Sequence, residues 1–599
     1  MAPGGYFGQA LIVDVAGADV ATERLDLPEE ILRGYLGGVG LGTWLMHQLA
    51  PVGVEPLAPP APLAFVFSPL VGTPLTTSAK FAVVAKSPLT GLLNDALASS
   101  QFAIAGKLTG NDALVIRGRA DTLSVLLVDS DGARLEPVED LSGSSAAEAE
   151  KSLRERFGRG WRAAVIGPAG ERGIRYATIS HDGRHAGRGG LGTVLGAKNL
   201  KAVLVRSAGK AAVADPDAVL AAARDLRARS FGPATAKYRE LGTLGNLLAF
   251  NAVANLPTRN FTAATFEGAP RLAAEELHDL RAVARKSCAS CSIGCEHIYQ
   301  RKGGGSQRME YENTFALGPL CGVDDPDMVM EASALCDALG LDTISAGGTI
   351  AWAMECVERG LIDAPWLRFG EGASVLRMLT EIGERSTELG RLLGEGSRRA
   401  AAVVGGGSGE FAPHVKGLEM PGYEPRTMQA MALGLAVNSR GADHNRSGAY
   451  EADLSGEHDR LAGGAPHVAA AIATEDRAAV MDSMILCKFL RGVFTDPFTE
   501  WAALLAPVTG WDVDAAELRA TAARIVDAKR SFNLAHGATA ADDTLPPRLL
   551  ETSLTVGSGR TASLTAQRLG GMVSAYYAAR GWDAEGRPPG TVLASHSAH

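Results

Sequence analysis

The 599-residue chain has no excess of positive charge, because 58 Lys and Arg residues face 67 Asp and Glu residues and leave a net charge of −9. Binding of nucleic acid or anionic membranes rewards clustered positive charge, so we expect neither partner. No apolar run reaches the roughly 18 residues of a membrane span. The opening MAPGGYFGQALIVDV lacks the basic and apolar segments of a signal peptide, which predicts a cytoplasmic protein.

Cysteine is also scarce, with an odd total of seven, and three of the seven lie within eight residues. A disulfide scaffold would use more cysteines, paired and spread along a secreted chain. The count therefore favours a reduced thiol protein. With 46% hydrophobic and 21% charged residues, the composition is that of an ordinary globular protein, and the length allows several domains.

Residues 1–207 are rich in short β-branched runs such as ALIVDVA, KFAVVAKS and KAVLVRS, with helical patterns between them. After residue 208 helical spacing of Ala and Leu dominates, beginning with a helix that Asp215 caps ahead of Pro216. The pattern predicts an α+β fold with a strand-rich domain (1–207) followed by two mainly helical domains (208–413 and 414–599).

The clustered cysteines are Cys288, Cys291 and Cys295 in SCASCSIGCEH, a C-x₂-C-x₃-C motif. Thiolates at this spacing reach one side of a turn and can bind one corner of a metal cluster. Zinc sites usually combine two C-x₂-C halves, and no second half is present, so an iron–sulfur cluster is favoured and zinc is the alternative. The candidates for a fourth ligand are His297, Cys321, Cys336, Cys356 and Cys487.

Further motifs cover nearly the whole chain. They are SPLVGTPLTTSAKFAVVAKSPLTG and GPAGERGIRYATISHDGRHAGRGGLGTVLGAKNLKAV before the cysteines, MEYENTFALGPLCGVDD and CDALGLDTISAGGTIAWAME after them, and SRGADHNR, DSMILCKF and ADDTLPPRLLE towards the end. With these motifs in this order, the sequence resembles the aldehyde:ferredoxin oxidoreductase family of tungsten (occasionally molybdenum) pterin enzymes.

The resemblance implies a tungsten or molybdenum ion held by two pterins beside a [4Fe-4S] cluster, with a Mg²⁺ bridging the pterin phosphates as a further candidate. It implies that Cys288, Cys291, Cys295 and Cys487 ligate the cluster. The positions that match the family's pterin contacts are Lys80, Ala186, Gly187, Asp337, Leu341, Asp342, Arg446, Asp482 and Leu486. A carboxylate at such a position can accept hydrogen bonds from the amide and amino edge of a pterin.

Three segments depart from the family pattern. Ile485 stands where the family usually has Gly, which questions the backbone path because Ile resists left-handed conformations. Lys80 replaces the usual Arg and keeps the charge without the bidentate geometry. In LASSQFA, Leu97 can still offer a carbonyl to Mg²⁺, whereas Ser99 and Ser100 are less permissive than the glycines they replace.

The family places a Glu and a His beside the metal, and the matching residues are Glu312 in EYEN and His444 in ADHNR. Glu310 is the nearest rival, with Tyr311 pointing away if the segment is extended. A buried carboxylate resists ionisation and can act as a base near neutral pH, and a His can donate to a substrate oxygen. The expected reaction is aldehyde and water to carboxylic acid, with two electrons leaving through the cluster.

Ferredoxin or a separate electron-transfer subunit is expected to accept these electrons. The basic residues Arg281, Arg285 and Lys286, just before the first cysteine, are a candidate docking patch for an acidic carrier. Some dimers of the family share a metal bridged by Glu-x-x-His. Here Glu331 is followed by Ala332, Ser333 and Ala334, so we expect no such metal in any homodimer.

Two other functions stay open at this stage. The same cofactor can act on another substrate, such as a hydroxycarboxylate or an acyl-CoA thioester, and a thiolate from Cys321 near the metal would favour such chemistry. The second possible function is that of an electron-transfer protein that binds the cluster but no pterin. The departures from the family pattern at Leu97, Ser99 and Ile485 motivate this alternative. The residues do not distinguish tungsten from molybdenum, because the direct ligands of the metal are pterin sulfurs.

Overall fold

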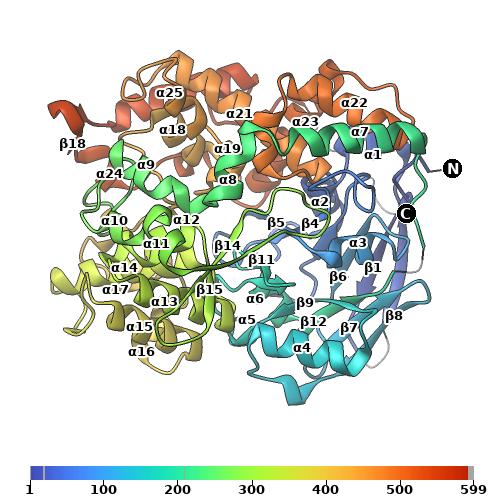
Figure 1. The fold of residues 1–599 in the computed structure, drawn as a ribbon, viewed down its shortest axis with the longest axis horizontal. Helices are drawn as coiled ribbons and strands as arrows, with labels where there is room; N and C mark the ends of the chain where they lie inside the picture. Colours follow the sequence, from blue (N-terminus) through green and yellow to red (C-terminus); the bar gives the residue numbers. More distant parts are fainter. Residues whose placement is uncertain (1, 18–19, 208, 591–599) are drawn as a thin grey trace.

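The computed structural model describes residues 2–17, 20–207 and 209–590. Two six-stranded sheets form the first third of the chain, blue to teal in Figure 1. The first sheet has the order β2-β1-β6-β3-β4-β5, with bounds Ala21–Asp26, Gln9–Asp14, Ala113–Arg117, Leu63–Val66, Lys80–Lys86 and Leu93–Ser99. The second has the order β11-β10-β9-β12-β7-β8, with bounds Arg184–Ala186, Ile179–His181, Arg162–Ile166, Leu200–Val205, Ser124–Asp129 and Gly132–Pro137.

Alternating side chains explain how the sheets are layered. In β1, Leu11 and Val13 pack into a core that both sheets share, whereas Ala10 and Ile12 face the large helical core. In β12, Val203 belongs to the shared core, whereas neighbouring side chains pack beneath a helix on the outer face. The helices of this region are α1 (Glu29–Tyr35), α2 (Gly38–Leu49), α3 (Gln101–Lys107), α4 (Ala146–Phe157), α5 (Pro168–Glu171) and α6 (Leu191–Ala197).

The middle third is mainly helical, as predicted, and begins at α7 (Pro216–Arg229), which Asp215 caps through a hydrogen bond to the Ala218 amide. Its other helices are α8 (Ala236–Glu240), α9 (Leu247–Ala252), α10 (Ala269–Leu272), α11 (Ala274–Arg281), α12 (Tyr311–Leu317), α13 (Pro326–Leu339), α14 (Thr343–Glu358), α15 (Gly372–Glu384), α16 (Glu388–Leu393) and α17 (Ser397–Val404). A three-stranded sheet of β13 (Ala282–Lys286), β14 (Glu296–Gln300) and β15 (Ser306–Met309) interrupts them.

The last third contains α18 (Gln429–Val437), α19 (His444–Ser447), α20 (Tyr450–Ser455), α21 (Ala465–Met484), α22 (Pro497–Thr509), α23 (Ala515–Ala535), α24 (Pro547–Glu551) and α25 (Ala566–Arg580). Short hairpins are formed by β16 (His414–Val415) with β17 (Leu418–Glu419), and by β18 (Leu554–Thr555) with β19 (Thr561–Ala562). The central helix α21 packs against α2, α18 and α23. In Figure 1, the strands β4, β5, β11 and β14 converge near the centre, where the first and middle thirds meet.

Two helices end in the same way, at α13 and at α21. Gly340 follows α13 with φ 77° and ψ 47°, and Ile485 follows α21 with φ 63° and ψ 42°. In both, the amides of the left-handed residue and of the next residue donate to one carbonyl, that of Cys336 or Met481. Ile485 therefore adopts the conformation expected of Gly, and its side chain is buried in the core between the sheets.

Glycine on the facing helix makes room for this isoleucine. A Cβ atom on Gly38, at the start of α2, would lie 2.3 Å from the Asp482 carbonyl and 2.7 Å from Ile485 Cγ1. At the matching position, a Cβ on Gly340 would lie 3.0 Å from the Gly167 amide nitrogen. A Cβ on Gly167 itself would lie 2.4 Å from the Leu339 carbonyl oxygen, so a glycine faces each of the two caps.

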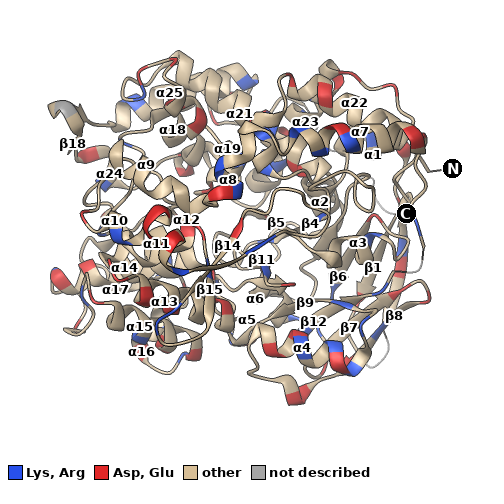
Figure 2. Cartoon of the chain, in the orientation of Figure 1, with Lys and Arg blue, Asp and Glu red and all other residues tan. Residues whose placement is uncertain are grey.

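Lys and Arg are interspersed with Asp and Glu over the elements in view in Figure 2. A helix both long enough and apolar enough to cross a bilayer does not occur among the described residues.

Replacement of Ile485 tests the left-handed cap. We expect both Ile485→Gly and Ile485→Ala to lower the free energy of unfolding, by about 2–5 kcal/mol for the lost side chain. The Gly variant should be the more stable of the two by roughly 1 kcal/mol, because only Gly adopts this conformation without strain. Urea unfolding of both variants measures the order. An Ala variant at least as stable as the Gly variant would contradict the left-handed geometry.

Candidate functional site

Two adjoining cavities lie where the sheet edges meet the helices. The cysteine cavity, about 320 Å³, is lined by the predicted residues Lys80, Gly187, Cys288, Cys291, Cys295, Glu312, Asp337, Leu341, Asp342 and Cys487. The histidine cavity, about 390 Å³, is lined by the predicted residues Lys80, Gly187, Glu312, His444, Arg446, Asp482, Leu486 and Cys487. Four of these residues line both cavities, so the two spaces form one site.

The four cysteines come from two distant segments that one threonine joins. Cys288, Cys291 and Cys295 lie in the loop between β13 and β14, and Cys487 follows the cap of α21. The amide of Thr77 donates to the Ser290 carbonyl in that loop (2.8 Å), while its hydroxyl oxygen accepts from the Cys487 amide (3.4 Å). The backbone therefore brings the fourth cysteine to the first three.

The sulfur atoms are spaced too widely for a preformed site of a single zinc ion. With Zn–S bonds of about 2.3 Å, the sulfurs of a tetrahedral site lie about 3.8 Å apart. Within the described ranges, no group of three Cys, His, Asp or Glu ligand atoms within 4.8 Å of one another includes a cysteine. Burial and the nearby sulfur of Cys487 raise the pKa of Cys291 to about 11, so a bound cation is needed to hold this thiolate at neutral pH.

Lys80 begins β4 and lines both cavities. Burial works to lower the pKa of its ammonium group, but the thiols of Cys487 and Cys288 and the carboxylate of Asp482 reverse this and raise it. Lys80 therefore remains a cation between the cysteines and the segment that ends α21.

The first predicted pterin segment surrounds the cap of α13. Burial raises the pKa of Asp337, but His185, whose Nε2 lies 3.1 Å from its carboxylate, together with Arg308 and Gln307, lowers it to about 2. Asp342 caps α14 by accepting from the Ile344 amide (3.2 Å). The lowered pKa makes Asp337 an ionised acceptor at neutral pH.

Arg188 connects this segment to the helical third. Its Nε donates to Asp342 (3.2 Å), and its other nitrogens donate to the carbonyls of Ala442 (3.1 Å) and Glu419. Arg188, two residues after β11, therefore connects the first predicted pterin segment with the loop that leads to His444.

The second predicted pterin segment contains a buried chain of alternating charges. Arg446 Nη1 lies 3.1 Å from Asp482, and its Nε donates to Asp95 in β5. Lys488 Nζ lies 2.9 Å from Asp482, and burial lowers the pKa of this lysine to about 8. Lys529 Nζ, from α23, lies 3.2 Å from Asp95. Opposite charges offset the cost of burying each of these ions.

Glu312 and His444 face each other in the histidine cavity, with 3.4 Å between Oε1 and Nδ1. Burial raises the pKa of Glu312 to about 8 and lowers that of His444 to about 3. The amide of Asn445 lies 3.0 Å from His444 Nε2, and because an amide N–H donates, the proton of the neutral ring is on Nδ1. The pair thus offers a carboxylate near its pKa and an imidazole N–H side by side.

These features agree with the comparisons with known proteins. The model "Aldehyde ferredoxin oxidoreductase, N-terminal domain" matches residues 10–207, and "Aldehyde ferredoxin oxidoreductase, domains 2 & 3" matches residues 221–596. The chain belongs to the aldehyde ferredoxin oxidoreductase family. It is therefore an oxidoreductase of a family characterised by a tungsten–pterin cofactor.

Members of this family with different activities are similar to the chain. The tungsten-containing aldehyde ferredoxin oxidoreductase of Pyrococcus furiosus is 33% identical and covers 98% of each chain. The WOR-like subunit of the aliphatic sulfonate oxidoreductase of the same organism is 27% identical over 98% of this chain and 96% of its own. The active-site complex BamBC of benzoyl coenzyme A reductase with 1,5-dienoyl-CoA has a TM-score of 0.81 at 22% identity, covering 98% and 96% of the two chains.

The structure corrects one expectation about the aldehyde ferredoxin oxidoreductase motif EYEN. The segment is not extended, because Glu310 caps α12 and Tyr311 begins the helix. Glu310 lines both cavities, but its carboxylate lies 3.4 Å from Arg184 and 3.7 Å from Arg308. Glu312 is the carboxylate that faces His444.

Other predicted residues lie in different surroundings. Ala186 ends β11 in the core between the sheets and lines neither cavity, whereas Gly187 beside it lines both. Cys321 lines neither cavity; it is buried, and its thiol donates to the carbonyls of Ala316 and Gly347. Leu97 lines both cavities, and Ser100 caps α3 from an extended conformation with φ −168°. The two serines of LASSQFA therefore occupy positions that do not require glycine.

The sequence motifs did not identify several residues of the site. Thr77, Arg188 and Asp95 act between segments that lie far apart along the chain. Thr77 and Arg188 lie in the motifs TTSAK and GRGG, next to residues that were assigned, and Asp95 lies two residues before Leu97. The aromatic wall of the histidine cavity was also missed: the Tyr423 ring stacks on His444 with 5.1 Å between centroids.

Proposed function

We propose that the chain oxidises an aldehyde with water to a carboxylic acid at a tungsten (or molybdenum) bis-pterin centre, and passes two electrons through a [4Fe-4S] cluster to ferredoxin or another carrier. The observation that supports this most is the joining of two cavities, one lined by four cysteines and the other by the Glu312–His444 pair. Candidate ligands of a redox cofactor and candidate proton-transfer groups thus line one connected space.

The residues of the site fit the cofactor of the family. Asp337 and Asp482 lie at matching positions, three residues before a left-handed cap, and both line the cavities. Carboxylates placed this way can accept from the amino edges of two pterins, and the cations Lys80 and Arg446 beside them can bind phosphate. When bound, the pterin–metal centre supplies the two-electron acceptor and the cluster transfers the electrons singly.

The proton chemistry is assigned to Glu312 and His444. With a pKa of about 8, a fraction of Glu312 is ionised at neutral pH and can take a proton from the attacking water. The Nδ1–H of His444 can donate to the carbonyl oxygen of the aldehyde and so polarise it for attack. Asn445 and the stacked ring of Tyr423 fix the orientation of the imidazole.

The exposed strand β13 is proposed as the docking surface for the electron carrier. All five of its residues are exposed, and it leads directly into the loop of the three cysteines. Arg281 is paired with Asp327 (2.7 Å) and Arg285 donates to the Arg239 carbonyl. Lys286, with no ion pair among the residues that are described, has its charge available for an acidic ferredoxin.

The site argues against the two alternatives. A ligand role for Cys321 would favour other chemistry on the same cofactor, but its thiol lies in the core and burial raises its pKa to about 12. A pterin-free relative was motivated by Ile485, Ser99 and Leu97, yet the α21 cap keeps the geometry of the α13 cap and the cavities persist.

Metal and activity measurements on anaerobically purified protein test the proposed function. We expect about four irons and one tungsten or molybdenum per chain, with pterin, and aldehyde-dependent reduction of ferredoxin. If the protein contains iron and pterin but converts a hydroxycarboxylate or an acyl-CoA thioester and no aldehyde, the proposed aldehyde substrate is wrong. Protein without pterin or heavy metal, from a host that makes both, would exclude the reaction.

Glu312→Gln should lower kcat/KM by about 10²–10⁴-fold, because a neutral amide cannot accept the proton. In the wild type, the ionised base is the active form, so log kcat/KM should rise with pH and level off near the pKa of about 8; the variant should lose this limb. Glu310→Gln is the matched control and should keep both rate and pH profile. A Glu310 variant that loses the limb while Glu312→Gln retains it would reverse the assignment.

Cys487→Ala should reduce the iron content far below that of the wild type, because the cluster loses one of its four thiolates. Cys321→Ala removes a thiol from the core and should keep the full iron content. Iron analysis and the electron paramagnetic resonance spectrum of the reduced protein measure both. Equal iron loss in the two variants would mean that the four-cysteine assignment is wrong.

Lys286→Glu should raise the KM for ferredoxin several-fold and weaken its dependence on salt, while turnover with a small dye acceptor stays unchanged. Lys151→Glu, an exposed charge reversal on α4, is the control and should change neither value. If the two variants behave alike towards ferredoxin, β13 is not the docking surface.

A further inference from the structure

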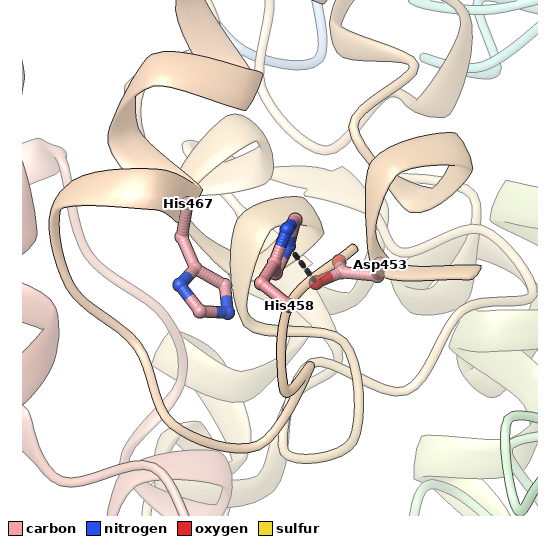
Figure 3. A group of neighbouring side chains, drawn as sticks. All are labelled: Asp453, His458 and His467. Atoms are coloured by element: carbon pink, nitrogen blue, oxygen red, sulfur yellow. Dashed lines mark ion pairs between the residues drawn. The ribbon is translucent and has the colours of Figure 1, made fainter. Parts of the chain in front are cut away.

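Asp453, His458 and His467 form a cluster outside the two cavities. Asp453 belongs to α20, His458 to the following loop, and His467 to the first turn of α21. Each offers one ligand atom, and the three atoms lie within 4.8 Å of one another. In Figure 3 the His458 ring lies between the Asp453 carboxylate and the His467 ring.

The contacts within this cluster leave a nitrogen atom of His458 without a hydrogen bond. His458 Nε2 lies 3.9 Å from Asp453 Oδ1, too far for a hydrogen bond. It is buried and makes no hydrogen bond within the described part of the chain. His467 is 1% exposed, and its ring centroid lies 4.4 Å from that of His458. Buried polar atoms in native proteins are normally paired, so the unpaired His458 Nε2 requires an explanation.

Asp453 also lacks a full counter-charge. Its carboxylate is fully buried and accepts from the amides of Ala430 (3.1 Å) and Met431 (2.9 Å) at the start of α18. Among the described residues, no Lys or Arg nitrogen forms an ion pair with it. A cation between this carboxylate and the two imidazoles would remove the imbalance.

We propose that Asp453, His458 and His467 bind a divalent transition-metal ion, with zinc as the best match. Two imidazoles and one carboxylate are zinc ligands, and a tetrahedral ion needs only one more, which water can supply. With bonds of about 2.0–2.1 Å, two donors on a tetrahedral ion lie about 3.3–3.4 Å apart, so the His458–Asp453 separation of 3.9 Å has to shorten by about half an ångström when the ion binds. His467 Nε2 lies 3.1 Å from the Asp459 carbonyl, a contact that metal binding replaces.

The position of the cluster assigns the ion a structural role. It joins α20, the start of α21 and, through Asp453, the start of α18. Asp482 lies 17 residues beyond the start of α21, about 26 Å along the helix. The ion therefore lies far from Asp482 and fixes the start of the helix whose other end carries this residue. The site is independent of the proposed aldehyde oxidation.

Zinc binding to the purified holoenzyme tests the proposal. After treatment with a chelator and removal of free metal, titration with Zn²⁺ should restore one zinc per chain and raise the unfolding temperature. Absorption spectroscopy at the zinc edge should report nitrogen and oxygen neighbours at about 2.0–2.1 Å. His458→Gln and His467→Gln should each lose the zinc and the thermal shift. His536→Gln, a half-buried histidine elsewhere, should keep both.

Three results would overturn the site: no zinc retained by the wild type, equal zinc in the variants and the wild type, or sulfur neighbours at about 2.3 Å, which would place the ion at the cysteines. The zinc-edge absorption spectrum of the wild type tests the site even if a variant does not fold. Iron and tungsten are measured in the same samples, so failure of the zinc site is separate from failure of the proposed oxidoreductase.

Discussion

The site depends on the buried ion pairs of Arg446 more than on any other contact. Its guanidinium binds Asp95 of β5 and Asp482 of α21, and it lies two residues after His444. One side chain thus joins a strand of the first third, the catalytic histidine and the second pterin segment. A buried arginine without its carboxylates would be strongly unfavourable, so these three elements are held together as a unit.

The electrostatics of the two cavities differ in a way that suits their proposed tasks. Near the cysteines, burial raises the pKa of Cys291, whose thiol stays neutral until a cation binds, while Lys80 remains charged. Near Glu312 and His444, burial keeps both groups close to neutral, and the ionised aspartates are balanced by arginines. Low polarity thus serves cluster binding at one end and proton transfer at the other, within one space.

The sequence predicted the fold class and the group of Cys288, Cys291 and Cys295, because strand alternation, helical spacing and thiol motifs are local patterns, whereas Cys487 came only from the family resemblance. The resemblance also led to Glu312, but the choice between Glu312 and Glu310 needed the structure, since the cap at Glu310 that starts a helix is not apparent in EYEN. Thr77, Arg188 and Asp95 could not be identified, because their importance arises from distant segments meeting in space. Asp453, His458 and His467 are spread over two helices and a loop, so no spacing motif marks them.

Ile485 illustrates why a departure from a family motif need not change a backbone. The residue keeps the left-handed cap because Gly38 opposite leaves room for its side chain, and the buried methyl groups compensate for the strain. Room for a left-handed cap thus depends on the residue packed against the cap as well as on the cap residue itself.

The separation of Cys487 from the other three cysteines has a consequence for biosynthesis. Thr77 and Cys288 to Cys295 leave the ribosome early, and their loop can form by itself, but the fourth sulfur follows almost 200 residues later. A cluster held by all four cannot be completed until most of the chain has been translated and α21 has docked. We therefore expect insertion of the proposed iron–sulfur cluster to be a late step, in which the maturation machinery recognises a nearly folded protein and not a nascent segment.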